Sequence, residues 1–229
     1  LVLKMNKKSL IIEFFGLPGS GKSTVVDFLY DLLQKNNIST IRFSEIFDKY
    51  QSNLMRKIYL TFISILLQPK LFFICWKYKN FDFKVLNQIV YILRLFYFEK
   101  TNYFKKSVKN YELIISDQYL VQAVASLMIP ITSKNIDKET IDFFLKYTLN
   151  KIDILVYSKC DIETSFERLR KRNNQRTRFD FWDDKKCLIN LERMNNIFEY
   201  VNNYSFGMII SIDANDEIEN KVRLIYKKI

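Results

Sequence analysis

The sequence contains no histidine and only four glycines, three prolines and three cysteines in 229 residues. Without histidine, a Ser-His-Asp triad, a histidine metal site and an imidazole general base are all excluded. The cysteines, at positions 75, 160 and 187, form no C-x-x-C pair. The sequence therefore indicates neither a disulfide framework nor a zinc site, and a reducing, cytoplasmic setting is expected. Any chemistry must use carboxylates, lysine, arginine, hydroxyl groups or a bound ion.

Length and charge narrow the class of protein further. The sequence shows no repeat and no linker, so residues 1–229 are expected to form one domain. The formal net charge is +11, but the lysines are spread along the whole chain, so nucleic acid is not expected as a partner. The longest apolar run, residues 58–67, is about half the length that a membrane span needs. The first residues also lack the apolar core of a signal peptide.

Short apolar runs alternate with helical patterns along the chain. The runs that read as buried strands are residues 9–15, 39–44, 111–117, 153–158 and 207–213. Strands that alternate with helices predict an α/β fold, with a parallel sheet covered by helices on both faces.

Residues 46–108 are long, helical in pattern and rich in Phe, Tyr, Ile and Leu. Pro69 and residues 79–82 are expected to break this helical insertion into two or three helices. One interpretation is that it packs on the core or on a second subunit, which would make a homodimer. The other is a peripheral membrane contact, because basic residues interleave the apolar ones.

Three of the four glycines fall within the stretch GLPGSGKS, which fits the phosphate-binding pattern G-x-x-x-x-G-K-[ST]. Glycine lets the backbone approach phosphates and turn its amides toward them at a helix N-terminus. Lys22 is predicted to contact the terminal phosphates, and the Ser23 hydroxyl to ligate Mg²⁺. The motif lies between a predicted strand and a predicted helix, so ATP and Mg²⁺ are the expected cofactors. The predicted nucleotide-binding residues of this loop are Gly16, Pro18, Gly19, Ser20, Gly21, Lys22, Ser23 and Thr24.

Arginine is concentrated in one segment, since five of the ten arginines lie in RLRKRNNQRTR while lysines number 26. Planar guanidinium groups suit phosphate oxygens and can neutralise charge that develops during phosphoryl transfer. Arg168 and Arg172 lie four residues apart on a predicted helix, and Arg176 and Arg178 follow in a polar loop. A solvated basic helix end is the alternative, and it is the expected role for Arg170.

Two carboxylates follow predicted strands, at the sheet edge where parallel α/β proteins bind ligands. Asp117 ends the strand LIISD, where it could hold Mg²⁺ directly or through water. Glu45 follows the second strand and could accept or position the proton of an acceptor hydroxyl. Asp48 in the same segment is a weaker candidate. Turn and helix-capping roles are the alternatives for these carboxylates.

The assembled motifs resemble the thymidylate-kinase-like branch of P-loop nucleotide and nucleoside kinases. The resemblance spans nearly the full length, through FFGLPGSGKST, SDQYLVQAVASL, FERLRKRNNQRTRFD and ISIDAND. It implies a P-loop fold whose arginine segment, about residues 168–182, forms a lid over the donor phosphates. It also implies that Asp117 lies near Mg²⁺ and that Ala214 and Asn215 lie beside the donor adenine.

The departures from that family concern the acceptor. Thymidylate kinases carry an acidic residue where this chain has Pro18, and Asp-Arg where it has Asp117 and Gln118. Their Arg-Glu-Pro segment is not reproduced by RFSEIF, so dTMP is not the expected substrate. The chain also resembles poorly characterised kinases often associated with bacterial surface-polysaccharide genes. Gln118 and Gln122 would then lie at the acceptor pocket, because side-chain amides can form hydrogen bonds with hydroxyl groups or with the edge of a nucleobase.

The sequence therefore predicts an ATP- and Mg²⁺-dependent kinase that phosphorylates a small-molecule acceptor of nucleoside, nucleotide or sugar type. Catalysis is assigned to Lys22, Arg172, Arg176, Arg178, Asp117 and Glu45. The alternative is a nucleotide-dependent switch or ATPase partner that docks through its aromatic, basic insertion.

Overall fold

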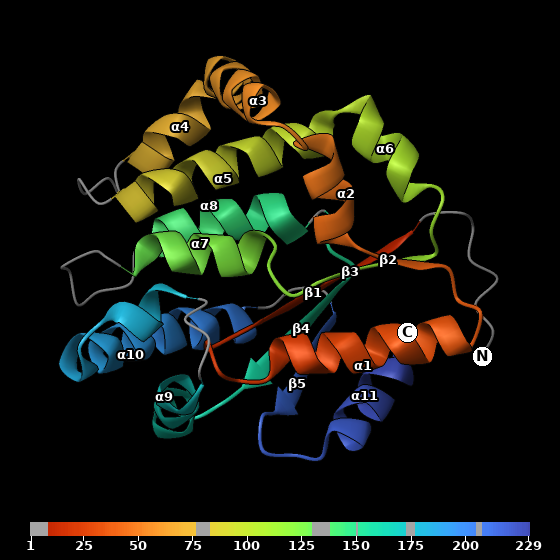
Figure 1. The fold of residues 1–229 in the computed structure, drawn as a ribbon, viewed down its shortest axis with the longest axis vertical. Helices are drawn as coiled ribbons and strands as arrows, with labels where there is room; N and C mark the ends of the chain where they lie inside the picture. The colour runs from red at the N-terminus through yellow and green to blue at the C-terminus, as the bar shows by residue number, and fades with distance from the viewer. Residues whose placement is uncertain (1–8, 77–82, 130–137, 150, 173–176, 205–207) are drawn as a thin grey trace.

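The computed structural model describes residues 9–76, 83–129, 138–149, 151–172, 177–204 and 208–229 (Figure 1). Five strands form one parallel sheet in the order β2-β3-β1-β4-β5. The strands are β1 (Leu10–Gly16), β2 (Thr40–Arg42), β3 (Leu113–Ser116), β4 (Ile154–Lys159) and β5 (Met208–Asp213). The predicted α/β class with a five-stranded parallel sheet is confirmed.

The second strand ends earlier than the sequence predicted. β2 stops at Arg42, and α2 (Phe43–Tyr50) begins at the next residue. Phe43, Ile46, Phe47 and Tyr50 recur at helical spacing and are all buried, so packing favours a helix here over a longer strand.

Helices cover both faces of the sheet (Figure 1). On one face lie α1 (Lys22–Lys35) and α11 (Ile218–Tyr226), which pack against each other and on the strands. On the other face α7 (Leu120–Met128) and α10 (Asp184–Asn202) contact β1, and α8 (Lys138–Leu149) packs on α7. Each face has its own cluster of buried apolar side chains, as a parallel sheet covered by helices requires.

The helical insertion is divided more finely than predicted. Its described residues lie in most of α2 and in α3 (Leu54–Leu67), α4 (Pro69–Trp76), α5 (Phe83–Lys100) and α6 (Asn102–Val108), which is five helices rather than two or three. The break at Pro69 is confirmed, and the predicted break at residues 79–82 lies outside the described residues. The additional boundaries follow from capping, because Asn53 accepts a hydrogen bond from the Arg56 amide and Thr101 accepts one from the Phe104 amide.

The insertion forms a second layer on the α7 side of the sheet. α5 packs on α7, while α3 and α4 pack on α5 and so lie farther from the sheet (Figure 1). No single helix within the described ranges is long and apolar enough to cross a bilayer. In the part of the chain that the structure describes, one pair of helices, α3 and α4, passes that test when taken together, and the two are bent by 99° at their junction.

The sheet order places a ligand-binding edge beside β1. β1 lies between β3 and β4, and the chain leaves its carboxyl end in the glycine loop. The chain places β2 and β3 on one side of β1, and β4 and β5 on the other. Open parallel sheets bind ligands at the carboxyl ends of the strands where the strand order reverses direction in this way. Asp117, directly after β3, and the loop after Gly16 therefore meet at one edge.

Candidate nucleotide site

The glycines of the loop allow it to lie closely against β4 and α9 (Ile162–Lys171). A Cβ atom at Gly16 would be 2.5 Å from the Ser158 carbonyl oxygen, and one at Gly19 would be 2.9 Å from that of Ser165. Gly19 also has φ +88°, in the left-handed region that other residues rarely adopt. Both positions therefore require glycine.

Two serines that the sequence analysis did not single out hold the loop in place. The Ser158 hydroxyl donates to the Ser20 carbonyl at 2.9 Å, and the Ser165 hydroxyl donates to the Pro18 carbonyl at 2.6 Å. Both serines are fully buried. Because two neighbouring elements fix its carbonyls, the loop is set before any ligand arrives, and ordering it on binding costs little.

The N-terminus of α1 is open to an anion. Gly21 precedes the helix, no side chain caps its first amides, and its first turn contains no acidic residue. The first amides of a helix have no partner within the helix and carry the positive end of its dipole. A phosphate group placed here would supply the missing acceptors.

Lys22 lies in the loop itself. Its ammonium donates to the carbonyls of Gly16 at 2.8 Å and Leu17 at 2.7 Å, and reaches the Ser20 hydroxyl at 3.3 Å. Burial lowers the pKa of Lys22 to about 8, although the negative charge of Asp117 opposes this shift. The cation is thus held by neutral acceptors, and a phosphate oxygen would be a stronger partner for it.

Ser23 and Asp117 are brought together from segments 94 residues apart, and the Ser23 hydroxyl donates to Asp117 Oδ2 at 2.7 Å. A hydroxyl and a carboxylate in contact are hard oxygen ligands of the kind that Mg²⁺ prefers. Within the described ranges, no group of three or more His, Cys, Asp or Glu residues could hold a metal ion by itself. An ion bound by this pair would therefore need further oxygens from a ligand and from water.

Three segments that are distant in sequence meet at Arg168. Its guanidinium donates to Asn215 Oδ1 at 3.0 Å and to the Gly19 carbonyl at 3.4 Å. Ala214 is buried, its amide donates to the Lys159 carbonyl at 2.7 Å, and its carbonyl accepts from Lys221 at 3.1 Å. The predicted donor-side residues after β5 thus lie beside the glycine loop, with Arg168 between them.

The arginine segment is arranged differently from the prediction. α9 ends at Lys171, so Arg172 has extended backbone and does not continue the helix face of Arg168. Arg172 binds Asp180 through two hydrogen bonds of 2.8 Å and also donates to the Thr177 hydroxyl at 2.9 Å. Its partners belong to the segment around the short 3₁₀ helix η1 (Arg178–Phe181). Arg176 lies outside the described residues.

Arg170 is not the solvated residue that was expected. It donates to Asp184 at 2.9 Å and to the Trp182 carbonyl at 2.7 Å. It therefore fastens the segment after η1 to α9, which is a structural role.

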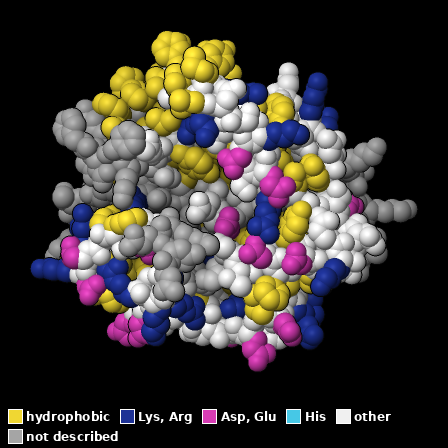
Figure 2. Space-filling model, viewed as in Figure 1, with side chains coloured by type: hydrophobic (Ala, Val, Ile, Leu, Met, Phe, Trp, Pro, Cys, Tyr) yellow, Lys and Arg dark blue, Asp and Glu magenta, His cyan; other side chains and the backbone are white. Residues whose placement is uncertain are grey.

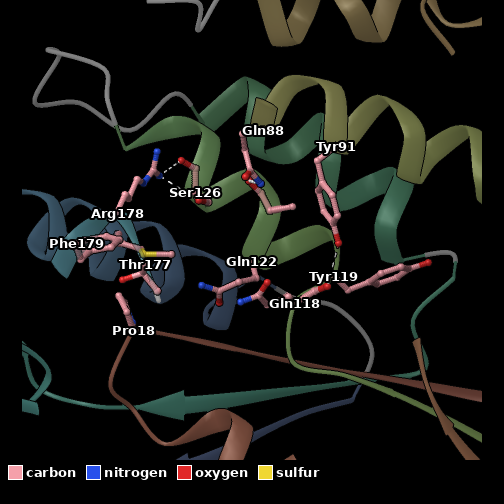
Figure 3. A pocket seen from close by; sticks show the side chains of 12 residues that line it. Pro18, Gln88, Tyr91, Gln118, Tyr119, Gln122, Ser126, Thr177, Arg178 and Phe179 are labelled. Carbon is pink, nitrogen blue, oxygen red and sulfur yellow. Dashed lines mark hydrogen bonds between the residues drawn. The ribbon is translucent and has the colours of Figure 1, made fainter. Parts of the chain in front are cut away.

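A pocket of about 300 Å³ lies next to the glycine loop (Figure 3). α5 contributes Gln88 and Tyr91 to it, and α7 together with its preceding turn contributes Gln118, Gln122 and Ser126. No carboxylate is among the described residues that line it. The remaining lining residues are Pro18, Tyr119, Ala123, Thr177, Arg178, Phe179 and Met194.

Arg178 belongs to this pocket, whereas the resemblance placed it over the donor phosphates. Its guanidinium donates to the carbonyl of Ser126 and to the Ser126 hydroxyl at 3.1 Å, as Figure 3 shows. It also lies 5.5 Å from the centre of the Trp182 ring, within reach of a cation–π interaction.

The two glutamines predicted at the acceptor pocket line it together (Figure 3). Gln118 is exposed, and its carbonyl accepts a hydrogen bond from the Tyr91 hydroxyl at 3.4 Å. Gln122 Oε1 accepts from the Gly16 amide at 3.2 Å, so this residue joins the pocket to the glycine loop. Glu45 is exposed in the first turn of α2 and is not among the lining residues.

A buried carboxyl behind the pocket was missed in the sequence. Glu13 is fully buried on β1, and its Oε1 accepts from the Gln122 amide at 3.1 Å at the start of α7. Oε2 has no partner among the described residues. Burial raises the pKa of Glu13 to about 8, although hydrogen bonds from backbone amides of α7 oppose the rise. The signal was visible, because Glu13 is the single charged residue in the apolar stretch SLIIEFF.

A second buried group supports the wall of the pocket. The Tyr119 hydroxyl donates to Glu99, which also forms an ion pair with Lys151. Burial raises the pKa of Glu99, while the positive charge of Lys151 opposes this rise. These contacts fix Tyr119 immediately before α7, where it lines the pocket.

Comparison with known proteins identifies the fold. No protein-family model and no curated protein sequence matches this chain. The structure is similar to that of deoxyadenosine kinase from M. mycoides with the products dCMP and a flexible dCDP bound, with a TM-score of 0.54. It is also similar to the same enzyme with bound dATP, with a TM-score of 0.53. In both cases the identity is 19%, and the match covers 96% of this chain and 98% of the other. The chain therefore has the five-stranded P-loop fold that is seen in that deoxynucleoside kinase.

Proposed function

We propose that this protein is a P-loop kinase that transfers the γ-phosphoryl group of ATP to a hydroxyl of an uncharged, nucleoside-type acceptor. The observation that carries the proposal is the position of Pro18. This residue belongs to the glycine loop and also lines the pocket. A phosphate held by the loop and an acceptor held in the pocket would therefore lie on two sides of the same few residues.

The donor side of this proposal uses the loop, Lys22, Ser23, Asp117 and Arg168. ATP supplies the phosphoryl group, and Mg²⁺ neutralises charge on its β- and γ-oxygens. The free amides of α1 and the Lys22 ammonium would hold the phosphates, and the Ser23–Asp117 pair would ligate the ion. Arg168, in contact with the loop and with Asn215, would lie between the phosphates and the base.

The acceptor side is supported by the chemistry of the pocket lining. Three glutamines and several hydroxyl groups offer donors and acceptors without charge, and Tyr91 and Phe179 offer aromatic rings. A nucleoside presents the matching features, namely a flat base with polar edges and a sugar with hydroxyl groups. A monophosphate acceptor fits less well, because the described lining has one cation, Arg178, among neutral polar, apolar and aromatic side chains.

Positioning and charge neutralisation would supply most of the catalysis. The transition state of phosphoryl transfer is loose, so the enzyme has little need of a strong base. This agrees with a pocket whose described lining contains no carboxylate. Glu45 stays a prediction as the proton acceptor, and an exposed residue on α2 would have to approach the acceptor hydroxyl for that role.

The test is to incubate the protein with γ-labelled ATP, Mg²⁺ and separate pools of nucleosides, nucleoside monophosphates and sugars. Label should move to the nucleoside pool. Lys22→Ala should abolish transfer, whereas Lys35→Ala, an exposed lysine at the far end of the same helix, should not change it. Label that moves to another pool would refute the acceptor class, and label found only in free phosphate would favour a nucleotide-dependent switch or ATPase.

A further inference from the structure

α3 and α4 present an apolar surface that the rest of the described chain does not cover. Among the described residues, nine of the fifteen large apolar side chains that are exposed belong to these two helices. Figure 2 shows yellow side chains gathered at the top of the molecule, where Figure 1 places α3. The residues of this α3–α4 surface are Leu54, Met55, Ile58, Tyr59, Phe62, Leu66, Leu67 and Phe73.

Six of the seven exposed apolar residues of α3 form one face of the helix. At 3.6 residues per turn, the six from Leu54 to Leu66 fall within an arc of about 140°. Leu60 and Ser64, which are buried, lie on the opposite side, toward the contact with α5. The helix is thus anchored by its inner face and by Ile65, which is partly buried and packs against the core, while the six exposed residues point away from the protein. Met55, which is 75% exposed, shows how little of that face is covered.

The charge of the same region has one sign. From Lys49 to Trp76 the chain contains no Asp or Glu, whereas the whole sequence has 25. The four cations of this stretch, Lys49, Arg56, Lys57 and Lys70, are all exposed. Arg56 and Lys57 fall on the two borders between the outer and inner faces of α3. Cations that flank an apolar face rich in aromatic residues are typical of helices that lie in a bilayer interface.

We infer that the α3–α4 surface binds the surface of an anionic phospholipid bilayer. The apolar side chains would enter the acyl boundary, while the flanking cations would meet the lipid phosphates. A second copy of the chain fits less well. A two-fold interface would bring the same patch against itself and would oppose the four cations with no carboxylate between Lys49 and Trp76 to pair with them. This inference does not depend on the proposed kinase activity.

Docking of this kind is compatible with the pocket. α5 lies between the α3–α4 surface and α7, and it contributes Gln88 and Tyr91 to the pocket (Figures 1 and 3). The α3–α4 surface and the pocket are therefore formed by different layers of helices. Substitutions on the α3–α4 surface can be studied without replacing a residue that lines the pocket.

Vesicle flotation tests the inference with the full-length protein. Wild type should float with vesicles of phosphatidylcholine mixed with phosphatidylglycerol, and not with phosphatidylcholine alone. Phe62→Ser and Phe73→Ser should each weaken binding about ten-fold or more, since each removes one aromatic ring from the acyl boundary. Lys57→Glu should weaken it by a similar factor, because it reverses a charge near the lipid phosphates.

Phe28→Ser is the matched control, because Phe28 is also exposed but lies on α1, on the other face of the sheet. It should bind vesicles as wild type does. Failure of the wild type to float, equal binding to neutral vesicles, or equal binding of all variants would each overturn the inference. A wild-type dimer in sedimentation velocity that Phe62→Ser dissociates, without vesicle binding, would assign the surface to a second copy instead.

Discussion

Replacing Glu13 with glutamine should remove most of a pH dependence that this buried carboxyl imposes on folding stability. Its pKa rises from an ordinary value of 4.5 to about 8 because the carboxyl is buried on β1. Between these two values the folded protein keeps a proton that the unfolded chain releases. The unfolded state then binds fewer protons, so stability falls as pH rises through this window.

The magnitude follows from the two pKa values. Between these two pKa values, each pH unit lowers the free energy of unfolding by about 1.4 kcal/mol. The wild-type protein therefore loses about 3 kcal/mol of stability by pH 7 and about 5 kcal/mol above pH 8. This is a large share of the roughly 5–15 kcal/mol that stabilises a typical protein. Glutamine keeps an oxygen that can accept from the Gln122 amide. Glutamine, like the protonated acid, carries a hydrogen-bond donor at the position of Oε2, which has no partner among the described residues. The cost of burying an unsatisfied donor is therefore similar in the variant and in the wild type.

Urea unfolding at several pH values between about 5 and 9, followed by circular dichroism, measures the effect. The free energy of unfolding of Glu13→Gln should exceed that of wild type by a margin that widens from below about 1 kcal/mol at pH 5 to about 3 kcal/mol at pH 7. Asp31→Asn, which removes an exposed carboxylate from α1, is the control for the loss of one charge. Parallel pH profiles for wild type and Glu13→Gln would refute the assignment of a neutral carboxyl to this site.

Three further predictions concern the proposed donor and acceptor sites. Binding of ATP should weaken as pH rises above about 8, because the buried Lys22 ammonium then loses its proton, and calorimetry at several pH values would detect this. Asp117→Asn should raise the Mg²⁺ concentration for half-maximal transfer about ten-fold or more, since it removes a charged ligand next to Ser23, with little change in Mg²⁺-free ATP binding. Arg168→Ala should raise the KM for ATP, and Arg178→Ala the KM for the acceptor, each by about ten-fold or more. The opposite pattern in these two variants would reverse the assignment of donor and acceptor sides.

The positions of the residues proposed for the donor side could be predicted because local patterns specify them. The glycine loop needs only a few consecutive residues, and its strand and helix follow from their own periodicity. Asp117 was found because a carboxylate directly after a buried parallel strand has to lie at the sheet edge. The contact of this residue with Ser23 then follows from the positions of β1 and β3 side by side.

The arginine segment was predicted less well, because the sequence of a cationic stretch does not specify which residue each arginine will contact. Arg172 was placed on a helix, but a Thr177–Asp180 capping box begins η1 just beyond it and offers a bidentate carboxylate. Arg178 contacts Ser126 of α7, because η1 packs its Phe179 against the core. A T-x-x-D pattern was visible in the sequence and could have suggested this turn.

The pocket could not be predicted from local patterns, since its walls come from segments that meet only when α5 packs on α7. Gln88 and Tyr91 lie about 70 residues beyond Pro18, and neither belongs to a recognisable motif. Their contribution depends on the orientation of α5, which the apolar content of the insertion leaves open. Long-range packing of this kind decides which polar side chains of a helix face a ligand.

α3 shows that sequence periodicity also does not decide which face of a helix is buried. Its periodicity predicts an apolar face, and the ordinary expectation is that such a face turns toward the core. In the structure, the inner face carries Leu60 and Ser64, and the broader apolar face is exposed. The contact with α5 can be made by small or medium-sized side chains, so burial of the larger face is not needed for folding. Phe62 and its exposed neighbours therefore add little to the stability of the free protein, and their apolar character is explained by the lipid partner proposed above.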